Sequence, residues 1–295
     1  MPSWNGKDYT IACLDSIASQ DYPLSSLEVI ISDNGSTDGS IEAVKEKFTV
    51  MNKYGFHNLI LLENGQNFGA PAAYNLCIPH LDSQCQYVLK IDNDTLIGNG
   101  AIFELIKAFD WQPDIGVVGA KMVSYDDTTV IAHSSGFLSR SNMRLSQGDA
   151  DTKTICDFVN GAGMMISAKL FFDQNMRFCE DFFIYYDDTD LCLAARQLGL
   201  KTIYWPDAQI RHKVSASSGS KLRNPTVCYY MTRGYIQCLL KYGSQRQRLL
   251  GFLSLFLFFN PKAVVGSIID KRLDAAGAIY LGSIHALVGK TGRWK

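Results

Sequence analysis

The sequence lacks the patterns that mark several large protein classes. Its eight cysteines form no CxxC pair and no zinc-type spacing, and no cleavable secretory signal is recognisable, so we expect reduced, mostly buried thiols in the cytosol. No Gly-rich basic loop for a triphosphate lies near the N-terminus, which argues against a nucleotidyltransferase. Basic residues interleaved with aromatic ones are also missing, which argues against a nucleic-acid partner.

What is present is typical of a globular protein with a full hydrophobic core. The chain has 295 residues, of which 47% are apolar, enough for one large domain or for one domain with an appendage. Its charge is divided unevenly. Residues 1–240 contain 19 Lys and Arg against 27 Asp and Glu, whereas residues 241–295 contain nine against two. The basic C-terminal part therefore suits an anionic partner, either a nucleic acid or a membrane surface.

Short apolar runs alternate with segments of helical periodicity through the first half of the chain. Strands are predicted at 27–32, 58–62, 87–91 and 115–119, and helices at 7–20, from the turn at 33–38 to about 53, at 69–79 and at 101–109. An irregular segment at 121–157 precedes a regular stretch at 158–166, a helix at 188–198 and two short strands at 201–205 and 209–212. Repeated β-α units predict an α/β fold with a mostly parallel sheet and helices on both faces. Residues 1–6 look like the tail of a first strand, which is expected to be truncated or missing.

The most informative stretch is Asp92-Asn93-Asp94, directly after the apolar run 87–91. Ligands of α/β proteins bind at the carboxyl ends of the strands, and two carboxylates at a strand end can hold a divalent cation together with phosphate oxygens. A polar turn after a strand is the plain alternative, because turns are rich in Asp and Asn.

Several further motifs accompany this triplet, and each is weak alone. They are Ser3-Trp4-Asn5-Gly6, Leu14-x-x-Ile17-x-x-Gln20-x-Tyr22-Pro23, Val29 to Asp38, Asn64-x-x-Asn67-Phe68-Gly69, Gly161-Ala162-Gly163, Phe183-x-Tyr185-Tyr186-Asp187-Asp188-Thr189-Asp190-Leu191, Pro206-Asp207-Ala208 and His212. As an ordered set over about residues 2–240, they resemble the family 2 glycosyltransferases of the GT-A fold, close to the bacterial rhamnosyltransferase-like group. The chain departs from that pattern in its short first strand and in Asp187-Asp188, where the family has Glu-Asp.

The resemblance implies a donor site and an acceptor site. The implied contacts to a nucleotide sugar are Pro2, Trp4, Asn5, Asp33, Asn67, Gly69, Asp92 and Asn93. Trp4 would stack on the base, and Asp33 would accept a hydrogen bond from a uracil or thymine N–H. Both have structural alternatives, since a Trp can cover a core edge and an Asp can stabilise its own turn. The acceptor would sit beside Gly161, Ala162 and Gly163.

The metal and the catalytic base are implied in the same way. Asp94 would bind Mn²⁺ or Mg²⁺, and His212 would be a second protein ligand. Asp92 would contact the ribose or a metal-bound water. Asp188 would be the general base that deprotonates the acceptor hydroxyl, giving inversion at the anomeric carbon, and Asp187 would assist it or orient the acceptor. Aspartates that open a helix also cap it, and crowding of like charges raises a carboxyl pKa.

The C-terminal part contains an 11-residue apolar run at 249–259, which Asn260-Pro261-Lys262 is expected to interrupt. That length is well short of the roughly 20 residues that span a bilayer. Apolar residues resume at 263–269, and an amphipathic helix is expected near 275–288. Flanking Lys and Arg with aromatic apolar faces suit helices that lie in a membrane interface. Packing on the catalytic body or on a second subunit, as a homo-oligomer, is the alternative.

The sequence thus predicts a metal-dependent inverting transfer of a sugar from a UDP- or dTDP-sugar, with rhamnose favoured by resemblance, onto a glycan or lipid-linked acceptor in cell-surface polysaccharide synthesis. Residues 1–224 would form the catalytic domain. Residues 225–295 would form a helical extension that contacts the inner face of the cell membrane through 245–290. The rivals are a non-catalytic nucleotide-sugar-binding or membrane scaffold protein and a nucleotidyltransferase.

Overall fold

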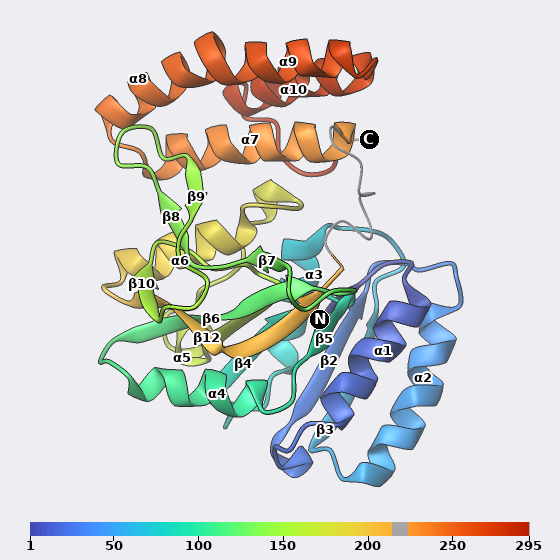
Figure 1. Ribbon diagram of the computed structural model, residues 1–295. Coiled ribbons are helices and arrows are strands. Elements are labelled where there is room, and N and C mark those ends of the chain that lie inside the picture. The colour runs from blue at the N-terminus through green and yellow to red at the C-terminus, as the bar shows by residue number, and fades with distance from the viewer. Residues whose placement is uncertain (214–223, 295) are drawn as a thin grey trace.

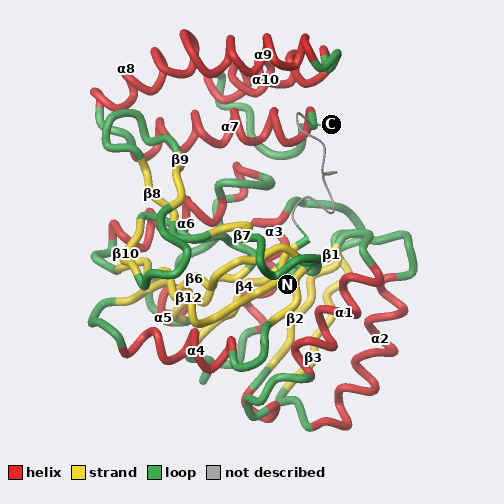
Figure 2. Tube along the Cα trace, viewed as in Figure 1, coloured by secondary structure: helices red, strands yellow, loops and turns green. Residues whose placement is uncertain are grey.

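A computed structural model describes residues 1–213 and 224–294 of the protein. Figure 2 shows the strands gathered in the middle of the N-terminal body with helices around them. The first sheet is parallel and contains β1 (Pro2–Ser3), β2 (Glu28–Asp33) and β3 (Asn58–Glu63). The helices of this part are α1 (Lys7–Ala18), α2 (Ser40–Met51) and α3 (Ala70–Cys77). These elements confirm the predicted β-α alternation, and the N-terminal segment contributes a two-residue strand beside β2.

The second sheet is mixed, whereas the sequence predicted mostly parallel pairing. Its strands run in the order β10 (Thr154–Cys156), β12 (Lys201–His212), β6 (Ile115–Ser124), β11 (Gly163–Ser167) and β4 (Tyr87–Ile91), with β5 (Thr95–Ile97) on β12 and β7 (Ile131–His133) on β6. Strands β6 and β12 are parallel, but β11 lies antiparallel between β4 and β6. The irregular segment returns the chain to the sheet without a crossover helix, so β11 can enter in the opposite direction.

Two further differences lie in the second half. The strands predicted at 201–205 and 209–212 form the single strand β12, whose register shifts between Trp205 and Gln209. Pro206 lies in this shift, where the missing N–H of proline breaks no ladder hydrogen bond. The irregular segment holds a hairpin of β8 (Gly136–Leu138) and β9 (Leu145–Gln147). The remaining helices of the body are α4 (Ala101–Lys107), α5 (Lys169–Phe172) and α6 (Asp187–Gln197).

Four helices form a separate layer over α6 and the β8–β9 hairpin (Figure 1). They are α7 (Pro225–Tyr242), α8 (Gln245–Ser254), α9 (Asn260–Ile269) and α10 (Leu273–Leu287). The interruption predicted at Pro261 is wrong. A π-helical turn at Leu255–Phe259 joins α8 to α9, and the helix is continuous over Gln245–Ile269, 25 residues. Proline has no backbone N–H and so removes one hydrogen bond from the helix, and the wider turn just before it lets the helix continue.

Helix α7 is tied to the body by a buried arginine. Arg233 is 1% exposed and donates hydrogen bonds to the carbonyl oxygens of Asp181 (3.0 Å), Phe182 (2.8 Å) and Gly292 (2.7 Å). It thus links α7 to the loop that leads into α6 and to the C-terminal end of the described chain. The division at residue 224 stays a prediction, and residues 214–223 before it lie outside the described residues.

Candidate active site

Two aspartates and a histidine meet where β4 and β12 end. Asp92 and Asp94 follow β4, and His212 is the last residue of β12, where it pairs with Thr95 of β5. One ligand atom from each of the three side chains lies within 4.8 Å of the others. The Nε2 atom of His212 is 3.3 Å from Oδ1 of Asp94, and both side chains are largely buried. The structure therefore brings together three residues that span 121 positions of the sequence.

The charges of this cluster favour the ionised form of Asp92. Burial opposes ionisation of Asp92, but the nearby Lys90 ammonium, His212 and a 2.6 Å hydrogen bond from the Tyr74 hydroxyl outweigh it and lower its pKa. Burial likewise opposes protonation of His212, but the carboxylates of Asp94 and Asp92 outweigh it and raise its pKa. Two carboxylate oxygens and one imidazole nitrogen are suitable donors for Mn²⁺, and less so for Mg²⁺, which prefers an all-oxygen shell. The Nδ1 atom of His212 is buried and has no hydrogen-bond partner among the described residues.

Lys90, which the sequence analysis did not single out, connects this cluster to the predicted base. Its side chain is 5% exposed, and its Nζ atom lies 3.1 Å from the carbonyl oxygen of Gly161 and 3.6 Å from Oδ2 of Asp187. The ammonium also lies 4.3 Å from the centre of the Tyr74 ring. A lysine within an apolar run that is predicted to be a buried strand was the available signal, since lysine is rarely buried without a partner.

We expect Lys90→Met to lower the turnover number by at least about 10-fold. The Asp187 carboxylate and the Gly161 carbonyl oxygen would lose the ammonium that holds them in place. Loss of a positive charge near Asp92 should leave cation-dependent nucleotide binding unchanged or tighter. Steady-state kinetics and nucleotide titration would measure both, with Lys201→Met as the matched control on β12. Normal turnover in Lys90→Met would contradict a role for Lys90 in positioning the catalytic groups.

The two candidate catalytic aspartates have different surroundings. Asp188 is half-buried, and its Oδ2 accepts a hydrogen bond from the Gly161 N–H (2.9 Å) while Oδ1 accepts from the Thr189 N–H (2.6 Å). Asp187 is buried, and its Oδ2 atom has no hydrogen-bond partner among the described residues. Burial raises the pKa of Asp187 to about 6, with Asp188 and Asp92 adding to the rise and Lys90 opposing it. The 3.6 Å separation from Lys90 marks an ion pair rather than a hydrogen bond.

The raised pKa of Asp187 makes its contribution to stability dependent on pH. The folded protein holds this proton up to about pH 6, whereas the unfolded chain loses it near 3.8. Stability from this group is therefore complete below pH 3.8 and is lost as the pH rises to about 6. Relative to the wild type, Asp187→Asn should gain free energy of unfolding across that window, by at most about 1.4 kcal/mol per pH unit. Urea unfolding at pH 4, 5, 6 and 7 measures this, and a constant difference would contradict it.

The predicted nucleobase contacts lie around one turn. Both carboxylate oxygens of Asp33 accept hydrogen bonds from Ser36, at 2.7 Å from its N–H and 2.6 Å from its hydroxyl, and Asp33 is buried. Asn5 bridges to the same turn through Ser36 and Thr37, and Trp4 is 39% exposed. Pro2 pairs with Ser32 as part of β1. The structural alternative for Asp33 is thus realised, while an exposed Trp4 remains free to stack; their roles toward a nucleotide stay predictions.

The remaining predicted residues make close packing contacts. Asn67 accepts a hydrogen bond from the Gly69 N–H, and a Cβ atom at Gly69 would lie 2.6 Å from the Phe183 carbonyl oxygen. Gly69 therefore brings α3 against the loop before α6, in addition to any role in binding. The Asn93 amide donates to the Thr10 hydroxyl.

On the acceptor side, the glycines of the predicted motif face the catalytic groups and the sheet. A Cβ atom at Gly161 would lie 2.3 Å from Lys90 Nζ and 3.0 Å from Asp188 Cβ. Ala162 is buried, and Gly163 packs against Met122. Only glycine at position 161 allows Lys90 and Asp188 to approach the same peptide.

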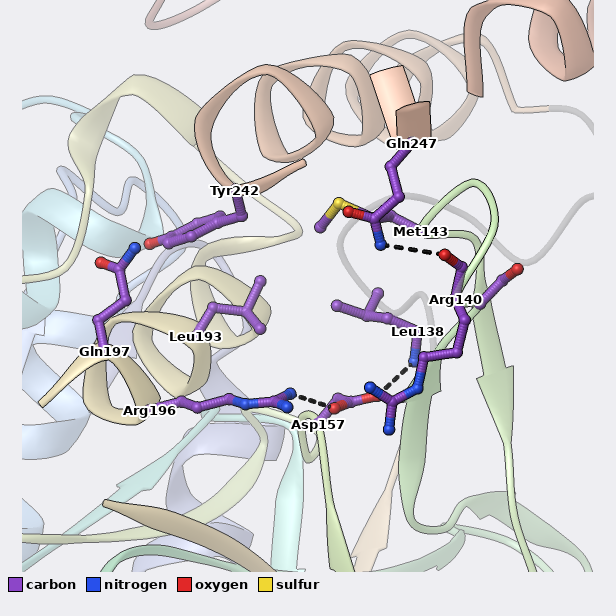
Figure 3. Close-up of a pocket in the computed structure, with 10 residues that line it drawn as sticks. Leu138, Arg140, Met143, Asp157, Leu193, Arg196, Gln197, Tyr242 and Gln247 are labelled. Atoms are coloured by element: carbon purple, nitrogen blue, oxygen red, sulfur yellow. Dashed lines mark hydrogen bonds and ion pairs between the residues drawn. The ribbon is translucent and has the colours of Figure 1, made fainter. Parts of the chain in front are cut away.

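A cavity of about 370 Å³ lies apart from these residues, between the β8–β9 hairpin and helices α6, α7 and α8 (Figure 3). Arg196 from α6 forms an ion pair with Asp157 (2.5 Å), and Gln247 from α8 donates to the carbonyl oxygen of Arg140 (3.3 Å). None of the candidate metal or catalytic residues lines it.

The family follows from comparison with known proteins. Residues 1–172, more than half of the chain, match the profile of glycosyl transferase family 2. The chain belongs to glycosyl transferase family 2. Residues 87–268 of this family 2 glycosyltransferase also match glycosyl transferase family group 2. The second match extends from the strand β4 into the helix Gln245–Ile269.

This family 2 glycosyltransferase matches two curated relatives over different shares of their length. It is 31% identical over 108 residues to a poly(ribitol-phosphate) beta-glucosyltransferase of Bacillus spizizenii, covering 35% of this chain and 15% of the relative. It is 24% identical over 219 residues to an N-acetylglucosaminyl-diphospho-decaprenol L-rhamnosyltransferase of Mycobacterium tuberculosis, covering 65% of this chain and 68% of the relative. The chain thus spans about one seventh of the length of the Bacillus relative.

Solved structures establish the fold of this family 2 glycosyltransferase as GT-A. A mannosyltransferase from Pyrobaculum calidifontis, in complex with GDP-Man and Mn²⁺, superposes with a TM-score of 0.66 at 16% identity, over 98% of this chain and 86% of that one. TarS of S. aureus superposes with a TM-score of 0.58 at 17% identity, over 97% of this chain and 52% of that one. The α/β prediction of the GT-A type is therefore confirmed, with the antiparallel strand β11 as the difference in pairing noted above.

Proposed function

We propose that this protein is a metal-dependent, inverting glycosyltransferase that moves a sugar from a nucleoside diphosphate donor to a glycan or lipid-linked acceptor. The observation that carries the proposal is the group of Asp92, Asp94 and His212, linked through Lys90 to the Asp187–Asp188 pair. Carboxylate and imidazole ligands next to a second pair of carboxylates supply the two functions that sugar transfer requires, charge neutralisation at the leaving diphosphate and a base for the acceptor hydroxyl.

Each residue has one task in this mechanism. Asp94, Asp92 and His212 would hold Mn²⁺ or Mg²⁺, which when bound neutralises the charge of the departing diphosphate. Asp188 takes the proton of the acceptor hydroxyl on Oδ2 as the oxygen attacks the anomeric carbon, and the Gly161 N–H keeps that carboxylate oriented. Lys90 pairs with Asp187 and donates to the Gly161 carbonyl oxygen, and these contacts hold the base and the Gly161 loop in place. A single displacement by this route inverts the anomeric carbon.

The donor and acceptor are proposed from the named relatives together with the site. An L-rhamnosyltransferase named for N-acetylglucosaminyl-diphospho-decaprenol and a poly(ribitol-phosphate) beta-glucosyltransferase favour rhamnose first and an acceptor used in cell-surface glycans. The proposed donor is a dTDP- or UDP-sugar. The exposed Trp4 ring beside the Asp33 turn is available to stack on a nucleobase.

Calorimetric titration with UDP and with dTDP, in Mn²⁺ and in EDTA, is the test. Micromolar binding that requires the cation would support the donor site and choose the base, and the anomeric configuration of the product, read by NMR, would report inversion. Binding without transfer to any offered acceptor would favour the non-catalytic nucleotide-sugar-binding alternative. A folded protein that binds neither nucleotide would overturn the proposal.

We also propose that the protein acts on the inner face of the cell membrane, with its C-terminal helices lying in the interface. Helix Gln245–Ile269 is long and apolar enough to cross a membrane by length and composition, and 17% of its most apolar stretch is buried. Its exposed residues include Phe258 (68%), Val265 (55%) and Ile269 (72%). Its other face is held by polar contacts, such as Asn260 with Ser283 at 3.1 Å, which a helix leaving the protein would have to break. An interfacial position keeps those contacts and buries the apolar face.

The triple variant Phe258→Gln, Val265→Gln, Ile269→Gln should bind phosphatidylglycerol vesicles at least about 10-fold more weakly than the wild type, a loss of about 1.4 kcal/mol. Three apolar side chains at helical spacing would otherwise enter the interface. Vesicle co-sedimentation measures this, with Phe103→Gln and Val130→Gln on the catalytic body as controls. If wild type ignores vesicles and elutes as a dimer that the triple variant dissociates, the apolar face is a subunit contact instead.

A further inference from the structure

A second cavity, of about 350 Å³, lies between the catalytic loop and the C-terminal helices. Its lining is mostly apolar and comes from the β8–β9 hairpin, the residue before α6, helix α7, the helix Gln245–Ile269 and α10. The residues that matter here are Arg144, Tyr186, Met231, Phe259, Ala263 and Ile279. The mechanism above makes no use of this space. Small-molecule sites have this size and a few polar groups in an apolar lining.

The two walls of this cavity belong to the two functional regions of the protein. Tyr186 directly precedes Asp187 and Asp188, adopts φ +64°, and packs against Gly234 of α7. The left-handed backbone at Tyr186 lies at the start of α6, so a residue that lines the cavity is joined directly to the catalytic pair. The opposite wall contains Phe259 and Ala263, which belong to the helix with the exposed apolar face. An apolar chain in the cavity would therefore touch both the catalytic loop and the surface proposed to meet the membrane.

Among the described residues that line the cavity, Arg144 is the one cationic group. Its guanidinium lies 3.2 Å from the centre of the Phe259 ring and 5.7 Å from that of Tyr235. No carboxylate of the described chain pairs with it, and partial burial lowers its pKa. A half-buried guanidinium held between aromatic rings, with its donors free of carboxylates, is suited to a phosphate oxygen.

We propose that this cavity binds the first part of the aliphatic chain of a phosphate-linked lipid acceptor, with Arg144 on its phosphate. The chain then leaves over the apolar face of the helix Gln245–Ile269, and the glycan end of the acceptor extends past Tyr186 toward Asp188. The identification of the lipid as the acceptor rests on the proposed function. The apolar lining disfavours a glycan, and the single cation disfavours a nucleotide diphosphate.

The test is calorimetric binding of monomeric n-octyl phosphate in EDTA, without donor, compared with n-octyl glucoside and inorganic phosphate. Wild type should bind octyl phosphate but neither octyl glucoside nor inorganic phosphate. Arg144→Gln should weaken that binding at least about 10-fold, Arg144→Lys should restore part of it, and Ala263→Trp should abolish it by filling the cavity. Val130→Trp, at an exposed aliphatic position on the catalytic body, is the control and should bind as wild type does. Equal binding by Arg144→Gln and Ala263→Trp, or equal binding of octyl glucoside, would overturn the proposal.

This test is independent of transferase activity. If octyl phosphate binds as expected and the nucleotide titration fails, the lipid site stands and the proposed function falls; the reverse result removes the lipid site alone. A membrane phospholipid is distinguished from the acceptor carrier with Ala263→Trp and phosphatidylglycerol vesicles. Retained vesicle binding, together with lost octyl phosphate binding and a raised KM for a lipid-linked acceptor, supports the acceptor site. Lost vesicle binding would assign the cavity to the bulk membrane and overturn the proposal.

Discussion

Asp188→Asn is expected to lower the turnover number by about 10³-fold, because removal of a general base costs between about 10² and 10⁴. Asparagine has nearly the same shape and can still accept one of the hydrogen bonds that Gly161 and Thr189 donate, so the start of α6 should remain formed. Nucleotide binding should be unchanged, since the metal-binding group lies at the ends of β4 and β12 and not on α6. Single-turnover kinetics with a saturating donor, together with calorimetry, would separate the two effects.

The matched control for this variant is Asp181→Asn, which removes the same charge from an exposed side chain in the loop before α6. It should keep full turnover. If Asp188→Asn also keeps its turnover, Asp188 is not the base, and Asp187 becomes the next carboxylate to replace. If both variants lose turnover and nucleotide binding together, the loop has been disturbed and the loss cannot be assigned to proton transfer.

Asp94→Ala is expected to weaken cation-dependent nucleotide binding by about 100-fold or more. Loss of a group that only orients a metal ligand already costs about 10 to 100-fold in affinity, and Asp94 is a proposed ligand itself. His212 would also lose the carboxylate 3.3 Å from its Nε2 atom. Titration of UDP or dTDP at several Mn²⁺ concentrations would show a weaker nucleotide affinity and a higher cation requirement.

Asp110→Ala, which replaces an acid in the short turn after α4, is the control and should bind nucleotide as wild type does. The prediction for Asp94 fails if the variant keeps the wild-type cation requirement, whatever its activity. If Asp94→Ala weakens nucleotide binding by less than about 100-fold, His212→Ala is the next variant to measure. It should show a loss of similar size if both residues bind the same ion.

The local features of this protein were predictable because they depend on short stretches of sequence. Strand β4 is an uninterrupted apolar run, and its end is marked by Asp92-Asn93-Asp94, so both the strand and the position of the carboxylates could be located. The helix α6 begins within one residue of its predicted start, since Asp187 and Asp188 favour a helix N-terminus. The Asp33 turn was equally clear, although its hydrogen bonds to Ser36 show that turn chemistry alone can explain that residue.

Contacts between distant segments decided the rest. Lys90 could be located on β4, but only the packing of β11 beside β4 places its ammonium against Gly161, 71 positions away. Only the packing of α6 on the sheet brings it to Asp187, 97 positions away. The continuity of the helix through Pro261 depends on a π-helical turn that no local propensity predicts. The cavity beside Tyr186 needs five separate segments to close around it.

The sequence by itself determined the main helices and strands of the N-terminal half, the strand-end acids and the family, because periodicity, turn chemistry and ordered motifs act over a few residues at a time. The tertiary structure alone decided which of these side chains share a site. Pairing of β12 with β5 brings His212 to Asp94, and antiparallel insertion of β11 brings Gly161 to Lys90. Strand order and register are set by the burial of both sheet faces across the whole chain, which a local pattern does not encode.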